Sequence, residues 1–221
     1  MAYENFIKGL RKRDNLTQME LSQILKISRN SIQAIENGST RFPSNAVLQL
    51  LSNYIGESEI NIMTKILFDD IPIDNNNYDE YIAERYIAMM YLDGWNIDQC
   101  PYHYKVFRRY VRCFECRLVK KRNYKNAAIV ALYKRFTFRV GEVKTKMDMI
   151  GYICDAISVV MGIKEPFRSV RIIFNADVEE ELRAFNFIDP DEFRRTLCFE
   201  MVFVLFDNKN SNIIKEIVIG E

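Results

Sequence analysis

The sequence lacks an apolar run long enough to cross a membrane, and it has no cleavable signal at its start. Its net charge is only +1, from 31 basic and 30 acidic residues, so overall charge says nothing about nucleic acid. Five cysteines, an odd number without a secretory context, are expected to stay reduced. A hydrophobic content of 48% with 28% charged residues excludes a disordered chain. We therefore expect a folded cytoplasmic protein with no membrane partner.

What the chain does have is a strong local pattern over residues 16–38, LTQMELSQILKISRNSIQAIENG. Thr17 and Glu20 have the spacing of a capping box, in which each side chain accepts a hydrogen bond from the other residue's backbone amide. Apolar residues then recur at helical spacing, which predicts a helix over residues 17–25. These apolar residues are Leu21, Ile24 and Leu25.

A second helix follows after a tight break. Ser28 is a candidate N-cap, Ile32 and Ile35 have the spacing of a buried helix face, and Gly38 can adopt the left-handed cap that ends a helix. Two short helices joined by a few residues are typical of a helix-turn-helix.

The stretch resembles the phage-repressor type of helix-turn-helix, whose pattern T-Q-x-E-L-x-x-x-L-x-[VI]-S-x-x-x-I-x-x-[IL]-E-x-G it follows nearly throughout. The resemblance covers roughly the first quarter of the chain. Ser22 departs from it, because alanine is usual there, and so does Lys26, because glycine is usual at the turn. Lys26 therefore implies either a left-handed residue other than glycine or a slightly different turn.

The resemblance implies a DNA-binding surface. Three residues in the exposed first turns of the second helix are expected to reach base edges in the major groove: Arg29, Asn30 and Gln33. Gln18 is where the family grips a phosphate, and further candidates for the DNA backbone are Ser28, Asn37 and Arg41. Arg11 and Glu36 stand where the family has a structural ion pair. The alternative is that the second helix of the motif contacts only other proteins and no DNA.

The rest of the chain indicates two domains. Helices at residues 4–13, 44–56 and 57–68 complete an all-α, five-helix domain over residues 1–68. Residues 69–77, DDIPIDNNN, have the composition of a linker. Residues 78–221 predict an α+β domain with about four to five strands. Its elements are expected at 78–92, 147–161 and 179–186 (helices) and at 128–134, 136–144, 170–175, 199–207 and 213–219 (strands). For residues 104–112 we favour a helix over a strand.

Two pairs of metal-binding residue types lie in this second part. Cys100-x-x-His103 and Cys113-x-x-Cys116 contain the only histidine and have the separation seen in zinc knuckles. No glycine follows either pair, however, and cysteines three apart in a helix are ordinary small core residues. We favour the reading without a metal.

A third pattern, Glu142-Val143-Lys144 before an apolar helix and a buried strand, is similar to the second half of the PD-(D/E)xK nuclease core. The aspartate that this core needs on a preceding strand has no obvious counterpart, because residues 127–134 contain no acid. A solvated strand end is the preferred interpretation, and no catalytic residue is assigned.

Together these patterns predict a sequence-specific DNA-binding transcriptional regulator, a repressor acting as a homodimer on double-stranded DNA. One alternative is a phage or mobile-element protein whose residues 78–221 bind and inhibit a host protein while the first domain regulates its own promoter. A further alternative is a helix-turn-helix fused to a nuclease domain.

Overall fold

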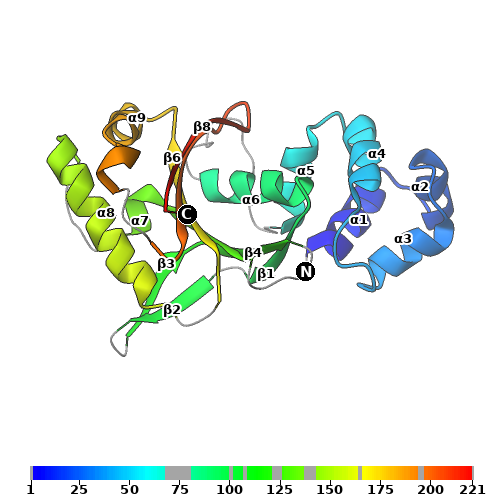
Figure 1. Ribbon diagram of the computed structural model, residues 1–221. Coiled ribbons are helices and arrows are strands. Elements are labelled where there is room, and N and C mark those ends of the chain that lie inside the picture. The colour runs from blue at the N-terminus through cyan, green and yellow to red at the C-terminus, as the bar shows by residue number, and fades with distance from the viewer. Residues whose placement is uncertain are drawn as a thin grey trace. The chain divides into compact units, whose positions relative to one another are not determined.

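The computed structural model describes residues 2–67, 81–99, 102–106, 109–120, 126–136, 143–163, 166–193 and 197–220 (Figure 1). The chain divides into two compact units, Met1–Tyr78 and Asp79–Glu221, and each has its own buried core. The predicted linker at 69–77 lies outside the described residues. Among the residues described, no helix has both the length and the apolarity to cross a membrane.

The first unit is built from helices, and the five-helix prediction is confirmed. The helices are α1 (Ala2–Arg13), α2 (Gln18–Ile24), α3 (Arg29–Glu36), α4 (Asn45–Ile55) and α5 (Glu59–Leu67). Each contributes apolar side chains to one core, among them Ile7, Leu21, Ile32, Leu48 and Ile62, which are fully buried. Burial of these one-sided apolar faces is what holds such short helices together, because helices of this length are marginal in isolation.

Local caps explain where the helices begin. The Thr17 hydroxyl accepts from the backbone N of Glu20 at 3.2 Å, and the backbone N of Thr17 donates to Glu20 Oε2 at 2.7 Å. Ser28 Oγ accepts from the backbone N of Ser31 at 3.0 Å, and Ser28 is the N-cap of α3. These bonds satisfy amides that a helix start leaves without partners, so each helix starts at a residue that the sequence itself marks.

The second unit is organised around a six-stranded mixed sheet. Its strands, in spatial order, are β1 (Trp95–Gln99), β4 (Cys116–Lys120), β5 (Ala128–Leu132), β6 (Ser169–Asn175), β7 (Glu200–Asp207) and β8 (Asn212–Ile219). The pairs β5–β6 and β6–β7 are parallel, and the others are antiparallel. A separate antiparallel pair joins β2 (Tyr102–Val106) to β3 (Arg109–Phe114).

Helices cover both faces of this sheet (Figure 1). On one face lie α7 (Tyr133–Phe136), α8 (Lys146–Met161) and α9 (Glu179–Asn186), packed on alternate residues of the parallel strands, such as Val170, Ile172 and Phe174 of β6. On the other face lies α6 (Ile82–Leu92), where the ring of Tyr86 meets that of Phe206 edge-on at 5.6 Å. The α+β prediction is confirmed, with six strands in the main sheet where about four to five were expected.

Polar side chains fix α6 on its face of the sheet. Arg85 Nε donates to the carbonyl oxygen of Asn208 at 3.0 Å, and Arg85 Nη2 donates to the Ser211 hydroxyl. The buried Tyr86 hydroxyl accepts from Arg171 Nη1 at 2.9 Å. Burial raises the pKa of Tyr86 to about 12, so the phenol stays neutral.

Two expectations for this unit were wrong. The helix favoured over residues 104–112 is replaced by strands β2 and β3, with residues 107–108 outside the described part. Aromatic and β-branched residues there suit a pleated surface better than a helix. The strand expected over 136–144 is also absent where it can be checked: Phe136 ends α7, and residues 143–144 lead into the capping box of α8 at Thr145. Residues 137–142 are not among those described.

Candidate nucleic-acid interface

Helix α3 has one buried and one exposed side. Ile32 and Ile35 are buried against the core, whereas Arg29, Asn30 and Gln33 are exposed. This division follows from the helical repeat, because side chains three and four residues apart share a face. The three residues expected to contact bases therefore lie on the solvent side of this helix.

These three side chains are also unengaged. None of Arg29, Asn30 and Gln33 makes a side-chain hydrogen bond or ion pair with another residue in the described part of the chain. Arginine can bond guanine through two donors, and asparagine or glutamine can bond adenine through a donor and an acceptor. The exposed side of α3 thus offers chemistry suited to base edges, and no bond to a described residue has to break before these side chains can contact a base.

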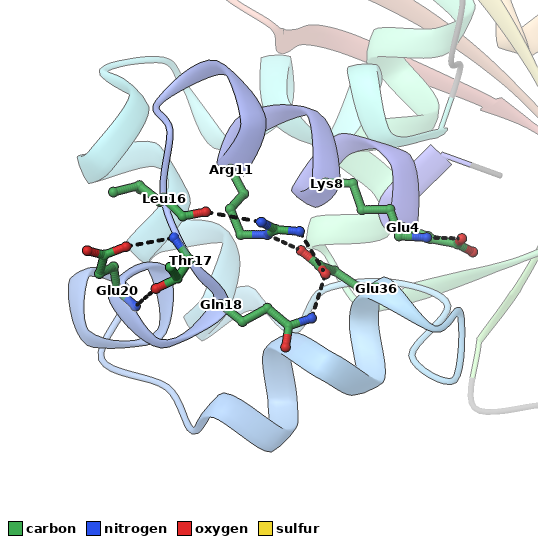
Figure 2. A network of polar contacts seen from close by, with 8 residues as sticks. All are labelled: Glu4, Lys8, Arg11, Leu16, Thr17, Gln18, Glu20 and Glu36. Carbon is green, nitrogen blue, oxygen red and sulfur yellow. Dashed lines mark hydrogen bonds and ion pairs between the residues drawn. The ribbon is translucent and has the colours of Figure 1, made fainter.

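A buried carboxylate holds α3 against α1 and α2 (Figure 2). Glu36, 4% exposed, accepts from Arg11 Nε at 2.7 Å on one oxygen and from Gln18 Nε2 at 2.7 Å on the other. Arg11 Nη1 also donates to the carbonyl oxygen of Leu16 at 3.1 Å. Glu36 thereby ties the end of α3 to α1 and α2, and Arg11 extends the network to the loop between α1 and α2.

Arg11 and Glu36 each stabilise the charged form of the other. Burial acts to raise the pKa of Glu36, but hydrogen bonds from Arg11 and Gln18 outweigh it, so the pKa of Glu36 is lowered. The hydrogen bond to Glu36 likewise raises the pKa of Arg11. Arg11 and Glu36 are therefore an ion pair at neutral pH, and the orientation of α3 depends on it.

Gln18, expected at a phosphate, has one amide hydrogen committed inside the domain. Its Nε2 donates to Glu36, and the side chain is half-buried at the first residue of α2. A glutamine amide carries two hydrogens, so the second can still donate outward. The bond to Glu36 orients the Gln18 amide and leaves one of its hydrogens able to donate to a phosphate.

The other backbone candidates differ in what they already do. Ser28 is exposed but its hydroxyl is used as the cap of α3 and also bonds the Ser31 hydroxyl at 2.8 Å. Asn37 is exposed at the C-cap of α3. Arg41 is exposed, and its guanidinium carbon lies 5.2 Å from the ring centre of Phe42. Asn37 and Arg41 thus remain more available than Ser28.

Lys26, which stands where glycine is usual in the turn between α2 and α3, adopts the left-handed conformation. Its φ is 51°, so a residue with a side chain occupies a left-handed conformation. Ser22, the other departure, is 4% exposed, and its hydroxyl donates to the carbonyl oxygen of Met19 at 2.7 Å. The hydroxyl that serine carries in place of a hydrogen of the alanine methyl is therefore satisfied within its own helix.

A comparison with protein families gives a match over residues 5–67 to the family described as a helix-turn-helix domain. The first unit carries a helix-turn-helix domain. Comparisons of the chain with curated proteins and with solved structures gave no match.

The zinc candidates lie outside this helix-turn-helix domain, and the structure describes them only in part. Cys100 is not among the described residues; His103 lies in β2 and Cys113 in β3, and their side chains are outside the described set. Cys116 is fully buried at the start of β4. Among the side chains that the structure describes, no three His, Cys, Asp or Glu residues are grouped as metal ligands. The absence of zinc stays a prediction.

The nuclease pattern also falls outside the domain. Glu142 is not described, and Lys144 is exposed in an irregular segment, where its backbone N donates to Asp148 Oδ2 at 3.1 Å. The described half of the pattern therefore belongs to the start of α8 and to no strand.

Proposed function

We propose that this protein is a sequence-specific regulator of transcription that binds double-stranded DNA through α3. The observation that carries the proposal is the exposed side of α3, where the side chains of Arg29, Asn30 and Gln33 make no hydrogen bond or ion pair to any residue that the structure describes. The helix-turn-helix match over residues 5–67 supports the same function, because this motif places its second helix in the major groove.

We propose further that the protein acts as a homodimeric repressor, and that residues 78–221 provide the dimer contact or bind a partner. A single helix-turn-helix reads a short site, and two copies related by a two-fold axis read paired half-sites about one helical turn apart. The second unit has its own core and so can serve as a separate module.

The test is selection of binding sites from random duplex DNA with the full chain. We expect Arg29→Ala and Gln33→Ala each to relax preference at particular positions, at a cost of about 1–3 kcal/mol of discrimination. Gln18→Ala should weaken binding to all sequences about equally. A matched control is Gln49→Ala, which removes an exposed glutamine from α4. Recovery of the same motif by wild type and by the Arg29→Ala/Gln33→Ala double variant would show that α3 does not read the bases.

The same DNA distinguishes a regulator from a nuclease. We propose that the chain protects its site without cutting it, and a footprint with magnesium present should show protection alone. Strand cleavage that needs magnesium and is lost in Lys144→Ala would instead support the nuclease alternative. Tight binding of residues 78–221 to a host protein would support the inhibitor alternative.

A further inference from the structure

The turn that joins α2 to α3 carries a residue whose side chain makes the backbone conformation unfavourable. Lys26 has a φ of 51°, in the left-handed region. Any residue with a Cβ crowds the following carbonyl oxygen there, whereas glycine adopts the conformation without that penalty. Glycine at this position would make the same turn more stable.

No polar contact of the Lys26 side chain with the described residues offsets this cost. The side chain is exposed, and its ammonium makes no hydrogen bond or ion pair with any residue in the described part of the chain. The turn is held by backbone bonds, from Lys26 N to the Gln23 carbonyl at 3.2 Å and from Ile27 N to the Ser22 carbonyl at 3.1 Å. The core contact comes from the buried neighbour Leu25. Lys26 thus combines an unfavourable backbone conformation with a charge that has no partner among the described residues. Such a residue is a candidate for a functional role, such as binding a ligand.

The place of Lys26 in the domain suggests that role. It lies three residues before Arg29, so the two α-carbons are at most about 11 Å apart. When a recognition helix enters the major groove, the helix before it crosses the phosphate backbone. Lys26 lies in the turn that joins these two helices. The groove is about 12 Å wide, so a lysine in this turn can reach its edge.

The local charges favour the same partner. The two carboxylates of α2 and α3 are both engaged inside the domain, Glu20 with the backbone N of Thr17 and Glu36 with Arg11. Lys26 and Arg29 are exposed cations without partners among the described residues. The ammonium of Lys26 is therefore not neutralised from within, and a phosphate would supply the missing charge.

We infer that Lys26 contacts a DNA phosphate beside the base pairs that α3 reads. This inference rests on the proposed DNA binding. It assigns Lys26 to affinity for any duplex and not to the choice of sequence, because phosphate contacts carry no base information. It also implies that a substitution of Lys26 by glycine, which makes the fold more stable, lowers the affinity of the protein for DNA.

The experiment compares Lys26→Gly and Lys26→Arg with wild type in the full chain. Thermal melting and the salt dependence of binding are measured, the latter with a selected site and with an unrelated duplex. Lys26→Gly should melt at a higher temperature because the strain is removed. It should bind both duplexes about eightfold more weakly at about 0.1 M salt, with a log–log salt slope shallower by about 0.9. Lys26→Arg should keep the wild-type slope without the gain in melting temperature.

Two further variants make the outcome decisive. Lys12→Ala removes an exposed lysine from α1 of the same unit and should leave the salt slope unchanged. Lys26→Asn, which also tolerates a left-handed backbone, provides the comparison if Lys26→Gly fails to fold. A wild-type salt slope in both uncharged variants would overturn the inference while leaving the proposed function intact. Failure of wild type to bind any duplex at low salt would instead overturn the proposed function, and this inference with it.

Discussion

Glu36 is the residue that ties α3, with its proposed DNA-binding surface, to α1 and α2. Its carboxylate is buried, yet it is charged because Arg11 and Gln18 both donate to it. Leaving such a group without donors would cost more than the net gain of its bonds, since a buried acceptor without a partner has lost water as well. The network therefore ties α1, α2 and α3 together in one arrangement.

We expect Glu36→Gln to lower the free energy of unfolding by about 1–3 kcal/mol at pH 7. The native pKa of Glu36 is below its ordinary value, so its contribution is complete above the ordinary glutamate pKa. It is lost as the pH falls through the lowered native pKa. The difference between wild type and Glu36→Gln should therefore shrink on acidification below about pH 4.

Glu4→Gln is the control for this pH series. Glu4 pairs with Lys8 at 2.6 Å on the half-exposed surface of α1, one turn apart in the helix. Such pairs contribute only about 0.3–0.5 kcal/mol, so the control should differ little from wild type at any pH. A Glu36→Gln effect that does not depend on pH would show that the loss comes from packing and not from the ion pair.

The metal question is also decided at the level of single residues. We expect the purified protein to contain no stoichiometric zinc, and His103→Ala to change stability by about 0.5–1 kcal/mol, as an ordinary substitution does. Elemental analysis and chelator titration measure this. One equivalent of zinc, lost together with cooperative unfolding when a chelator is added, would make Cys100, His103, Cys113 and Cys116 a structural site.

Among the five helices of the first unit, α2 is the shortest, with seven residues, so the loss of its cap should be felt clearly. Thr17→Ala removes the acceptor for the Glu20 backbone N, and we expect it to lower the stability of the first unit by about 1 kcal/mol. Calorimetry of the full chain measures the change as a lower melting temperature for that unit. Thr40→Ala, at an exposed threonine of the loop before α4, should leave the transition unchanged.

The only tryptophan gives a second control. Trp95 lies at the start of β1 in the second unit, so its fluorescence reports unfolding of that unit alone. Thr17→Ala should not move the tryptophan transition. A shift of that transition by Thr17→Ala would mean that the two units unfold together.

Elements whose signals are local could be predicted from the sequence. The start of α3 follows from Ser28, and α9 has the expected bounds, Glu179–Asn186. Gly38, with a φ of 74°, follows α3 because a left-handed residue is needed there. Caps and helical repeats act over a few residues, and a single sequence shows them directly.

Elements that depend on partners distant in the sequence could not be predicted in this way. Strand β1 pairs with β4 and not with its neighbour β2, and both β1–β4 and β2–β3 have irregular registers. Short apolar runs suit a buried helix or a strand equally, so periodicity alone could not decide residues 104–112. The candidate site shows the same limit: the exposed face of α3 follows from spacing, whereas the bond from Gln18 to Glu36 arises only when the helices pack.

For the whole molecule, the division into two units predicts independent folding. A chain cut near residue 74 should give two folded parts, since each unit has its own core. Residues 1–70 alone should bind the selected DNA much more weakly than the full chain, because one half-site contact replaces two linked ones. Titration of both proteins against the same duplex measures the difference.

The control for this comparison is a duplex that contains only one half-site. On it, the full chain and residues 1–70 should bind with similar affinity. Equal affinity on the complete site as well would mean that residues 78–221 do not join two copies, and the proposed dimer would be wrong.

The most direct test of the account is the specificity of the full chain for one DNA sequence. The full chain is titrated at a single salt concentration with the selected duplex and with a shuffled duplex of the same composition. Base contacts from α3 predict that the selected duplex binds at least about 1,000-fold more tightly. Equal affinity for the two would mean that only phosphates are contacted, and it would contradict the claim that this protein reads sequence.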